Sequence, residues 1–212
     1  MQLKFLPSFV KRKGRITKRQ ELGLNELEKF SISTIENINI EKEKFSQCHL
    51  EIGFGNAENL CSMAKSYPDI LFIGSEVYAS GVGSLLATIK EDSIKNIRIF
   101  NQDIRILLDK NPEEVFDKVV IICPDPWPKD RHHKRRLINE EFLHMLHKTI
   151  KPAGIIYIST DWEHYAESIK NSLEISNYFS NTKTEEKLTF SKFENRGIEE
   201  GREIFEFRYV KN

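Results

Sequence analysis

Residues 50–57 read Leu50-Glu51-Ile52-Gly53-Phe54-Gly55-Asn56-Ala57, an apolar run that enters a Gly-x-Gly turn. Glycine tolerates positive φ and lets backbone N–H groups approach a ligand closely at the start of a helix. A tight strand-to-helix turn also needs glycines for its geometry alone. The stretch therefore predicts a strand, a turn and a helix, and it makes the turn a candidate ligand site.

Outward from this turn, strand and helix patterns alternate along the chain. Short β-type runs occupy residues 49–54, 70–77, 97–102, 115–123, 154–160 and 204–209, with a weaker one near 178–182. The run 119–122 is apolar on both faces, as a strand covered by helices on two sides must be. We expect one α/β domain over residues 1–212, with a Rossmann-like, doubly wound, mostly parallel sheet of about seven strands.

The two ends of the chain depart from this alternation. Residues 1–19 predict a basic, flexible arm, and a first helix is expected over about 20–30. The last two strand candidates are joined by a segment with no obvious helix. We therefore expect the sheet to end in an antiparallel, hairpin-like pair that includes the C-terminal strand.

Two further acids are expected at the ends of the next two strands. Glu76 follows Glu51 by 25 residues, where an acid can accept both hydroxyls of a ribose, and Asp103 follows the third strand, where it can meet an adenine amino group. An acid directly before the glycine turn repels a pyrophosphate but suits a positively charged amino-acid tail. S-adenosylmethionine therefore fits these acids better than a dinucleotide, and three ordinary solvated acids are the simpler alternative.

Positive charge is concentrated in two short segments, although 32 Lys and Arg balance 32 Asp and Glu. Residues 1–20 carry +7 and residues 129–136 carry +4. Such clusters on an otherwise acidic chain indicate a polyanionic partner such as nucleic acid, whereas a basic tail and one solvated loop are the plainer interpretation. No apolar run approaches the ~20 residues of a membrane helix. The three cysteines show no paired or metal-ligand spacing, so we expect a cytoplasmic setting and no bound metal.

The fourth predicted strand leads into a proline-rich loop followed by cations. It reads Pro124-Asp125-Pro126-Trp127-Pro128-Lys129-Asp130-Arg131-His132-His133-Lys134-Arg135-Arg136. Three prolines in five residues fix φ, so Asp125 is held in a defined position beside the predicted crevice. Trp127 either stacks on a base or covers the sheet edge, and the cations that follow can neutralise phosphates.

This loop resembles the signature of the bacterial tRNA (guanine-N(7)-)-methyltransferase family. The resemblance extends to residues 8–10, 14–17, 50–55, 72–76, 160–162 and 191–197, and it runs from about residue 8 to residue 209. Ala57 stands where a further glycine is often found, and Ser191 stands where threonine is common. Both replacements are small changes, so the resemblance implies that the activity is retained.

The resemblance implies methyl transfer from S-adenosylmethionine to the N(7) atom of a guanosine in the variable loop of tRNA, forming 7-methylguanosine. It implies that the cofactor is bound by Glu51, Gly53, Gly55, Glu76, Asp103 and Asp125, and that Asp125 is also the catalytic residue. It assigns the substrate nucleotide to Lys129, Asp161, Ser191, Lys192, Phe193 and Glu194. It assigns tRNA contacts to Arg131, His132, His133, Lys134, Arg135 and Arg136. Family members are monomers or homodimers, and the sequence does not select between them.

The chemistry of guanine adds one hypothesis. Its N1–H and exocyclic amine form a donor pair that adenine lacks, and a carboxylate can accept both. We expect Asp161 or Glu194 to read this edge.

Three other functions compete with tRNA methylation. Asp125-Pro126-Trp127 also resembles the acid-Pro-Pro-aromatic loop of amino-methyltransferases, but the basic flanks favour an RNA substrate. An RNA-binding module without turnover would have no need of all four cofactor acids. A nicotinamide dehydrogenase would need a third turn glycine and a catalytic His or Tyr in the crevice, and neither is evident.

Overall fold

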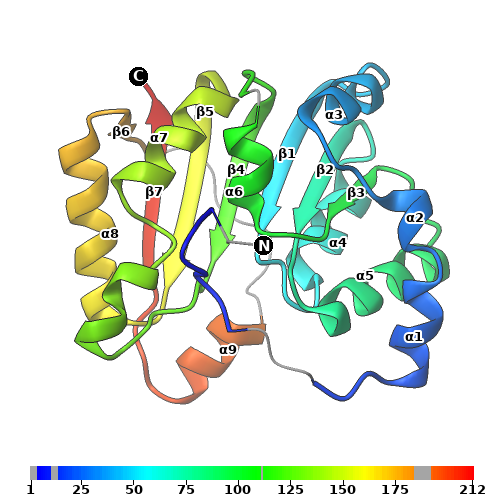
Figure 1. Ribbon diagram of the computed structural model, residues 1–212, viewed down its shortest axis with the longest axis horizontal. Coiled ribbons are helices and arrows are strands. Elements are labelled where there is room, and N and C mark those ends of the chain that lie inside the picture. Colours follow the sequence, from blue (N-terminus) through cyan, green and yellow to red (C-terminus); the bar gives the residue numbers. More distant parts are fainter. Residues whose placement is uncertain (1–3, 11–13, 111, 184–191) are drawn as a thin grey trace.

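The computed structural model describes residues 4–10, 14–110, 112–183 and 192–212, with the backbone alone for residues 192 and 193. A single sheet lies between two layers of helices (Figure 1). Within these ranges, every helix is too short or too polar to cross a lipid bilayer.

The sheet confirms the expected α/β architecture. Its strands are β1 (Gln47–Ile52), β2 (Ile70–Ser75), β3 (Ile97–Phe100), β4 (Phe116–Ile122), β5 (Ile150–Thr160), β6 (Phe179–Asn181) and β7 (Phe205–Lys211). They lie in the order β3-β2-β1-β4-β5-β7-β6. Neighbours from β3 to β5 are parallel, whereas β7 is antiparallel to both β5 and β6. The C-terminal strand is therefore inserted between two others and does not form the edge.

Helices cover both faces of the sheet because both faces are apolar. One face packs against α3 (Ile35–Lys42), α6 (Ile104–Asp109), α7 (Glu140–Thr149) and α8 (Glu163–Ser176), and the other against α4 (Glu58–Ser66) and α5 (Ala79–Glu91). In β2, Leu71 and Ile73 belong to the first core while Ile70 and Phe72 belong to the second, because strand side chains alternate. Burying each of these side chains contributes ~1.5 to 3 kcal/mol, so neither face can stay bare.

Two expectations about helices are wrong. The helix expected over about 20–30 is divided into α1 (Lys18–Leu24) and α2 (Leu27–Phe30), because α1 is closed at Asn25, whose N–H donates back to the Gly23 carbonyl. A helix also lies between β6 and β7, where none was expected. This is α9 (Lys192–Glu199).

The order of the strands positions the site. The order reverses between β1 and β4, and open α/β sheets bind their ligands outside the carboxyl ends of the strands at such a reversal. In Figure 1 the parallel strands point toward the lower edge of the molecule, where α9 also lies. A short 3-10 helix, η1 (Asp130–Arg135), follows β4 after the proline-rich loop.

Candidate active site

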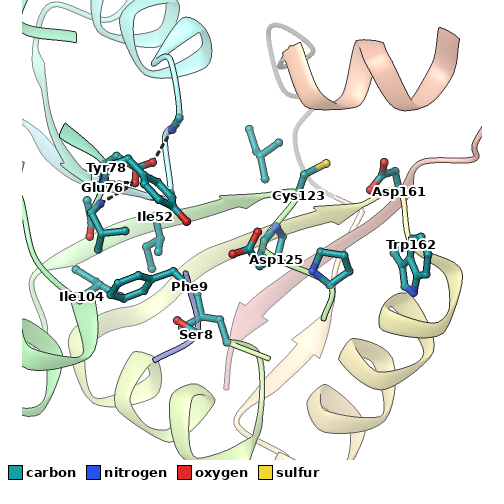
Figure 2. A pocket seen from close by; sticks show the side chains of 18 of the residues that line it. Ser8, Phe9, Ile52, Glu76, Tyr78, Ile104, Cys123, Asp125, Asp161 and Trp162 are labelled. Carbon is teal, nitrogen blue, oxygen red and sulfur yellow. Dashed lines mark hydrogen bonds between the residues drawn. The ribbon is translucent and has the colours of Figure 1, made fainter. Parts of the chain in front are cut away.

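A cavity of about 440 Å³ lies at the carboxyl ends of the parallel strands. The segments that follow β1, β2, β3, β4 and β5 all contribute to its wall. Figure 2 shows Glu76 and Tyr78 at one end of the cavity, Asp161 and Trp162 at the other, and Asp125 between them. We refer to these as the Glu76 end and the Asp161 end.

The turn after β1 has the left-handed backbone that its glycines predict. Gly53 and Gly55 have φ of +73° and +55°, and both line the cavity. Ala57 also has a positive φ of +68°, although a Cβ makes this region unfavourable. Ala57 directly precedes the first residue of α4. The resemblance suggested glycine at this position, and the left-handed backbone explains why glycine would suit it.

Glu76 ties the end of β2 to the glycine turn. One carboxylate oxygen accepts from the Gly55 N–H at 3.0 Å, and the other accepts from the N–H groups of Val77 and Tyr78 at 2.6 and 3.0 Å. Burial raises the pKa of Glu76, an effect that these three donors oppose and the negative charge of Asp125 reinforces. The side chain lines the cavity as expected, and its carboxylate is fixed in orientation.

Glu51 lies behind the turn, and the described residues that line the cavity do not include it. It is 6% exposed, and its carboxylate accepts from Asn59 Nδ2 at 2.8 Å. Burial raises the pKa of Glu51 to about 8, opposed by this hydrogen bond and assisted by Glu58 and Glu194. Among the described residues Asn59 Oδ1 is buried with no hydrogen-bond partner. Glu51 and Asn59 thus form a buried group of acceptors.

Asp103 caps the start of α6 and lines the cavity. Its carboxylate accepts from the Arg105 backbone N–H at 3.1 Å and pairs with the Arg105 guanidinium at 2.6 Å. Arg105 also donates to the Leu6 carbonyl at 2.9 Å. The expected cofactor acid is therefore held by a cation that also holds the N-terminal segment.

The proline-rich loop places Asp125 at the surface of the cavity, and Trp127 connects this loop to the N-terminal segment. The Trp127 backbone has φ of +47°, and its indole N–H donates to the Ser8 carbonyl at 2.9 Å. The Arg135 guanidinium lies 4.9 Å from the centre of the Trp127 ring. Trp127 thus ties the loop to the N-terminal segment, and its expected role in base stacking stays a prediction.

The cations of η1 differ in exposure. Lys129, Arg131 and Lys134 are exposed, whereas His132, His133 and Arg135 are half-buried. Arg136 is 4% exposed, and its guanidinium donates to the Pro126 carbonyl at 2.9 Å and lies 4.9 Å from the centre of the Tyr165 ring. Burial lowers the pKa of Arg136. This contradicts the expectation that Arg136 contacts tRNA, because its donors are directed into the protein.

Asp161 lines the cavity and forms an ion pair with Arg202. The distance between Asp161 Oδ2 and Arg202 Nη1 is 3.0 Å. Glu194, from α9, is fully buried and accepts from the Ser159 hydroxyl at 2.8 Å. A Cβ built on Gly197 would lie 3.1 Å from Asp161 Oδ2, so α9 packs closely on this carboxylate. Of the two acids expected to read guanine, Asp161 is the one that faces the cavity.

Three of the expected nucleotide contacts are less fully described. Ser191 lies outside the described residues, and Lys192 and Phe193 are described by their backbone in the first turn of α9.

The N-terminal residues 4–10 lie against the body of the protein, although the sequence predicts a flexible arm. Lys4 pairs with Asp109, and the carbonyl of Val10 accepts from the Tyr78 hydroxyl at 2.7 Å. Ser8 and Phe9 line the cavity. Sequence reasoning missed both as site residues, although the resemblance over residues 8–10 was an available signal.

Two sequence comparisons agree with this site. A family model described as "Putative methyltransferase" matches residues 46–207. A tRNA (guanine-N(7)-)-methyltransferase of Legionella pneumophila (strain Paris) is 40% identical, and the match covers 98% of this chain and 93% of that protein. An enzyme of the same name from Nitrosococcus oceani is 38% identical, with 98% and 91% covered.

Solved structures support the fold. A 16S rRNA (adenine(1408)-N(1))-methyltransferase from Catenulisporales acidiphilia superposes with a TM-score of 0.61 at 14% identity, covering 83% of this chain and 90% of that chain. At this identity the likeness shows a shared architecture. The sequence matches extend over nearly the whole chain and include the glycine turn and the proline-rich loop, and the chain belongs to the tRNA (guanine-N(7)-)-methyltransferase family.

Proposed function

We propose that this protein transfers a methyl group from S-adenosylmethionine to the N(7) atom of a guanosine in the variable loop of tRNA. One observation carries the proposal. A single cavity joins Glu76 and Asp103, which suit a nucleoside, to Asp125 and Asp161, which suit the base to be methylated.

The residues at the Glu76 end fit this cofactor. A volume of about 440 Å³ is in the range that holds a molecule of this size. Glu76 can accept the ribose hydroxyls, and Asp103 can accept the adenine amino group. The buried acceptors of Glu51 and Asn59 behind the glycine turn suit the ammonium of the amino-acid tail, since the Asn59 oxygen is otherwise unsatisfied among the described residues.

The bound cofactor supplies a methyl group on a sulfonium centre. Guanine N(7) carries an in-plane lone pair and no proton, so no residue has to act as a base before transfer. The protein contributes chiefly by positioning, which can lower a barrier by ~7 to 11 kcal/mol when the reacting atoms are held in line. Asp125 stands between the two ends of the cavity on a stiff loop. Its carboxylate stabilises the positive charge that moves onto the purine.

The Asp161 end selects the base. We assign the N1–H and amino group of guanine to Asp161, because Glu194 is buried and bonded to Ser159. Glu194 then holds α9 against β5. Lys129, Ser191, Lys192 and Phe193 remain proposed nucleotide contacts.

The exposed cations beside the cavity complete the proposal. Lys129, Arg131 and Lys134 follow the loop that carries Asp125, where phosphates of a docked tRNA would come near. His132, His133 and Arg135 offer further donors at the same surface. A tRNA substrate places the protein in the cytoplasm.

The test is to incubate the protein with unmodified tRNA and labelled S-adenosylmethionine, and then to map the label by borohydride reduction and aniline cleavage. We expect cleavage at one variable-loop guanosine, strongly reduced in Asp125→Ala. Asp92→Ala, which removes an exposed carboxylate that pairs with Lys65, is the control and should retain activity. Labelled tRNA that resists cleavage would instead indicate amino methylation.

A further inference from the structure

Arg202 forms an ion pair with the carboxylate of Asp161 at the Asp161 end of the cavity. It lies between α9 and β7, lines the cavity, and places Nη1 3.0 Å from Asp161 Oδ2. The side chain of Asp161 is 17% exposed and that of Arg202 is 34% exposed, so the pair is partly shielded from water. Such an ion pair is stronger than one at an open surface.

The position of Arg202 is determined by its neighbours. Its backbone N–H donates to the Gly197 carbonyl at 2.8 Å, and its guanidinium also donates to Glu200. Glu200 in turn pairs with Arg196 at 2.7 Å. These contacts hold the guanidinium over Asp161 while α9 packs against the same carboxylate through Gly197.

The contact is incomplete, however. Among the described residues, Arg202 Nε is buried and has no hydrogen-bond acceptor. A buried donor without a partner is energetically unfavourable. An arrangement that leaves such a donor unsatisfied is easier to displace than one in which every donor is paired.

Guanine and arginine offer a carboxylate the same chemistry. The N1–H and the exocyclic amine of guanine are two nitrogens attached to one carbon, as in a guanidinium, and both point the same way in one plane. A carboxylate can accept from either group in the same geometry. Adenine has an acceptor at N1 and cannot offer this pair of donors.

We propose that Arg202 occupies, on Asp161, the place that the guanine edge takes during the reaction, and that it is a specificity-determining residue. This inference rests on the proposed function. Guanine displaces the guanidinium from Asp161 because it offers the same pair of donors, whereas adenine leaves the ion pair of Asp161 and Arg202 in place. Removing Arg202 therefore tightens the binding of a guanosine-containing substrate selectively.

The test compares two unmodified tRNAs that differ only in guanosine or adenosine at the methylated position. Their dissociation constants are measured at one salt concentration for the wild type, Arg202→Gln and Arg202→Lys, with S-adenosylhomocysteine present. Loss of a positive charge weakens both tRNAs alike, so the ratio of the two constants cancels this effect. Arg98→Gln is the matched control, because Arg98 pairs with Glu41 at 2.6 Å on β3 at the far edge of the sheet.

We expect Arg202→Gln to raise the preference for guanosine by about threefold or more, with Arg202→Lys between it and the wild type and Arg98→Gln equal to the wild type. A preference that stays constant or declines in Arg202→Gln overturns the inference, while the proposed function stands if the wild type methylates guanosine. A wild type that neither methylates tRNA nor prefers guanosine overturns the proposed function itself.

Discussion

The indole N–H of Trp127 donates a 2.9 Å hydrogen bond to the backbone carbonyl of Ser8, 119 residues earlier in the chain. Trp127 belongs to the loop that carries Asp125, and Ser8 belongs to the segment that walls the cavity. The loop expected to perform the chemistry and the N-terminal segment are therefore joined directly.

Trp127→Phe should weaken S-adenosylhomocysteine binding by about fivefold, because it keeps an aromatic ring but removes the indole N–H that holds Ser8. Tyr78→Phe, which loses the bond to the Val10 carbonyl, should act in the same direction. Isothermal titration calorimetry measures both effects. Tyr67→Phe, at a half-exposed site on the C-terminal end of α4, is the control. Unchanged affinity in both test variants would show that the segment does not support the cofactor pocket.

Asp125→Asn should lower kcat for tRNA methylation by about 100-fold, since the amide keeps the size of the side chain but removes the charge that stabilises the methylated purine. The affinity for S-adenosylhomocysteine should change much less. Single-turnover assays at saturating cofactor separate the two quantities. A loss confined to cofactor affinity would reduce Asp125 to a binding residue.

The stability of the protein without cofactor should fall as the pH rises from about 5 to 8, in part because of Glu51. Its pKa is about 8 in the folded protein and 4.5 ordinarily, so the folded state holds a proton that the unfolded chain has lost. The stabilisation is complete below the ordinary value and is lost as the pH rises through 8, at up to about 1.4 kcal/mol per pH unit.

In Glu51→Gln the side chain at position 51 cannot ionise. The free energy of unfolding of this variant should therefore decline less between about pH 5 and pH 8 than that of the wild type. Urea unfolding at a series of pH values measures both curves. Parallel curves would mean that Glu51 is ionised in the folded protein at neutral pH.

Arg136→Lys should lower kcat by about tenfold or more and leave the salt dependence of tRNA binding unchanged. Lysine keeps the charge but cannot both donate to the Pro126 carbonyl and stack on Tyr165, so the loop carrying Asp125 would shift. By contrast, Arg131→Gln should reduce the slope of log affinity against log salt concentration by about 1, because Arg131 is exposed.

Binding titrations at several salt concentrations distinguish these two roles. The contrary outcome is a reduced slope of log affinity against log salt concentration in an Arg136→Gln variant that still unfolds cooperatively. It would show that Arg136 contacts tRNA after all.

The sequence predicted the sheet well because its strands obey simple rules. Residues 70–73 alternate between two apolar cores, and the glycines at 53 and 55 adopt the positive φ for which glycine is suited. The sequence also predicted that acids at the carboxyl ends of successive strands would face one crevice. In the structure Glu76, Asp103 and Asp125 line one cavity.

The remaining features depend on contacts that leave no periodic pattern. Residues 4–10 are held largely through backbone carbonyls, which every residue possesses. Helix α9 is rich in polar residues, and its position reflects the close approach of Gly197 to Asp161. Arg136 is buried although its neighbours in the basic run are exposed or half-buried, and this burial depends on Tyr165 from α8, about 30 residues later in the chain. The cluster of cations and the family resemblance had both pointed to a tRNA contact for Arg136.

The path of residues 4–10 also bears on the timing of turnover. The segment is held through its backbone carbonyls by Arg105, Trp127 and Tyr78, and it contributes Ser8 and Phe9 to one wall of the cavity. A segment anchored by its backbone at three points does not move aside by the rotation of one side chain, which takes nanoseconds or less. We therefore expect spent cofactor to exchange past this wall only when the whole segment lifts, a motion slower than side-chain rotation.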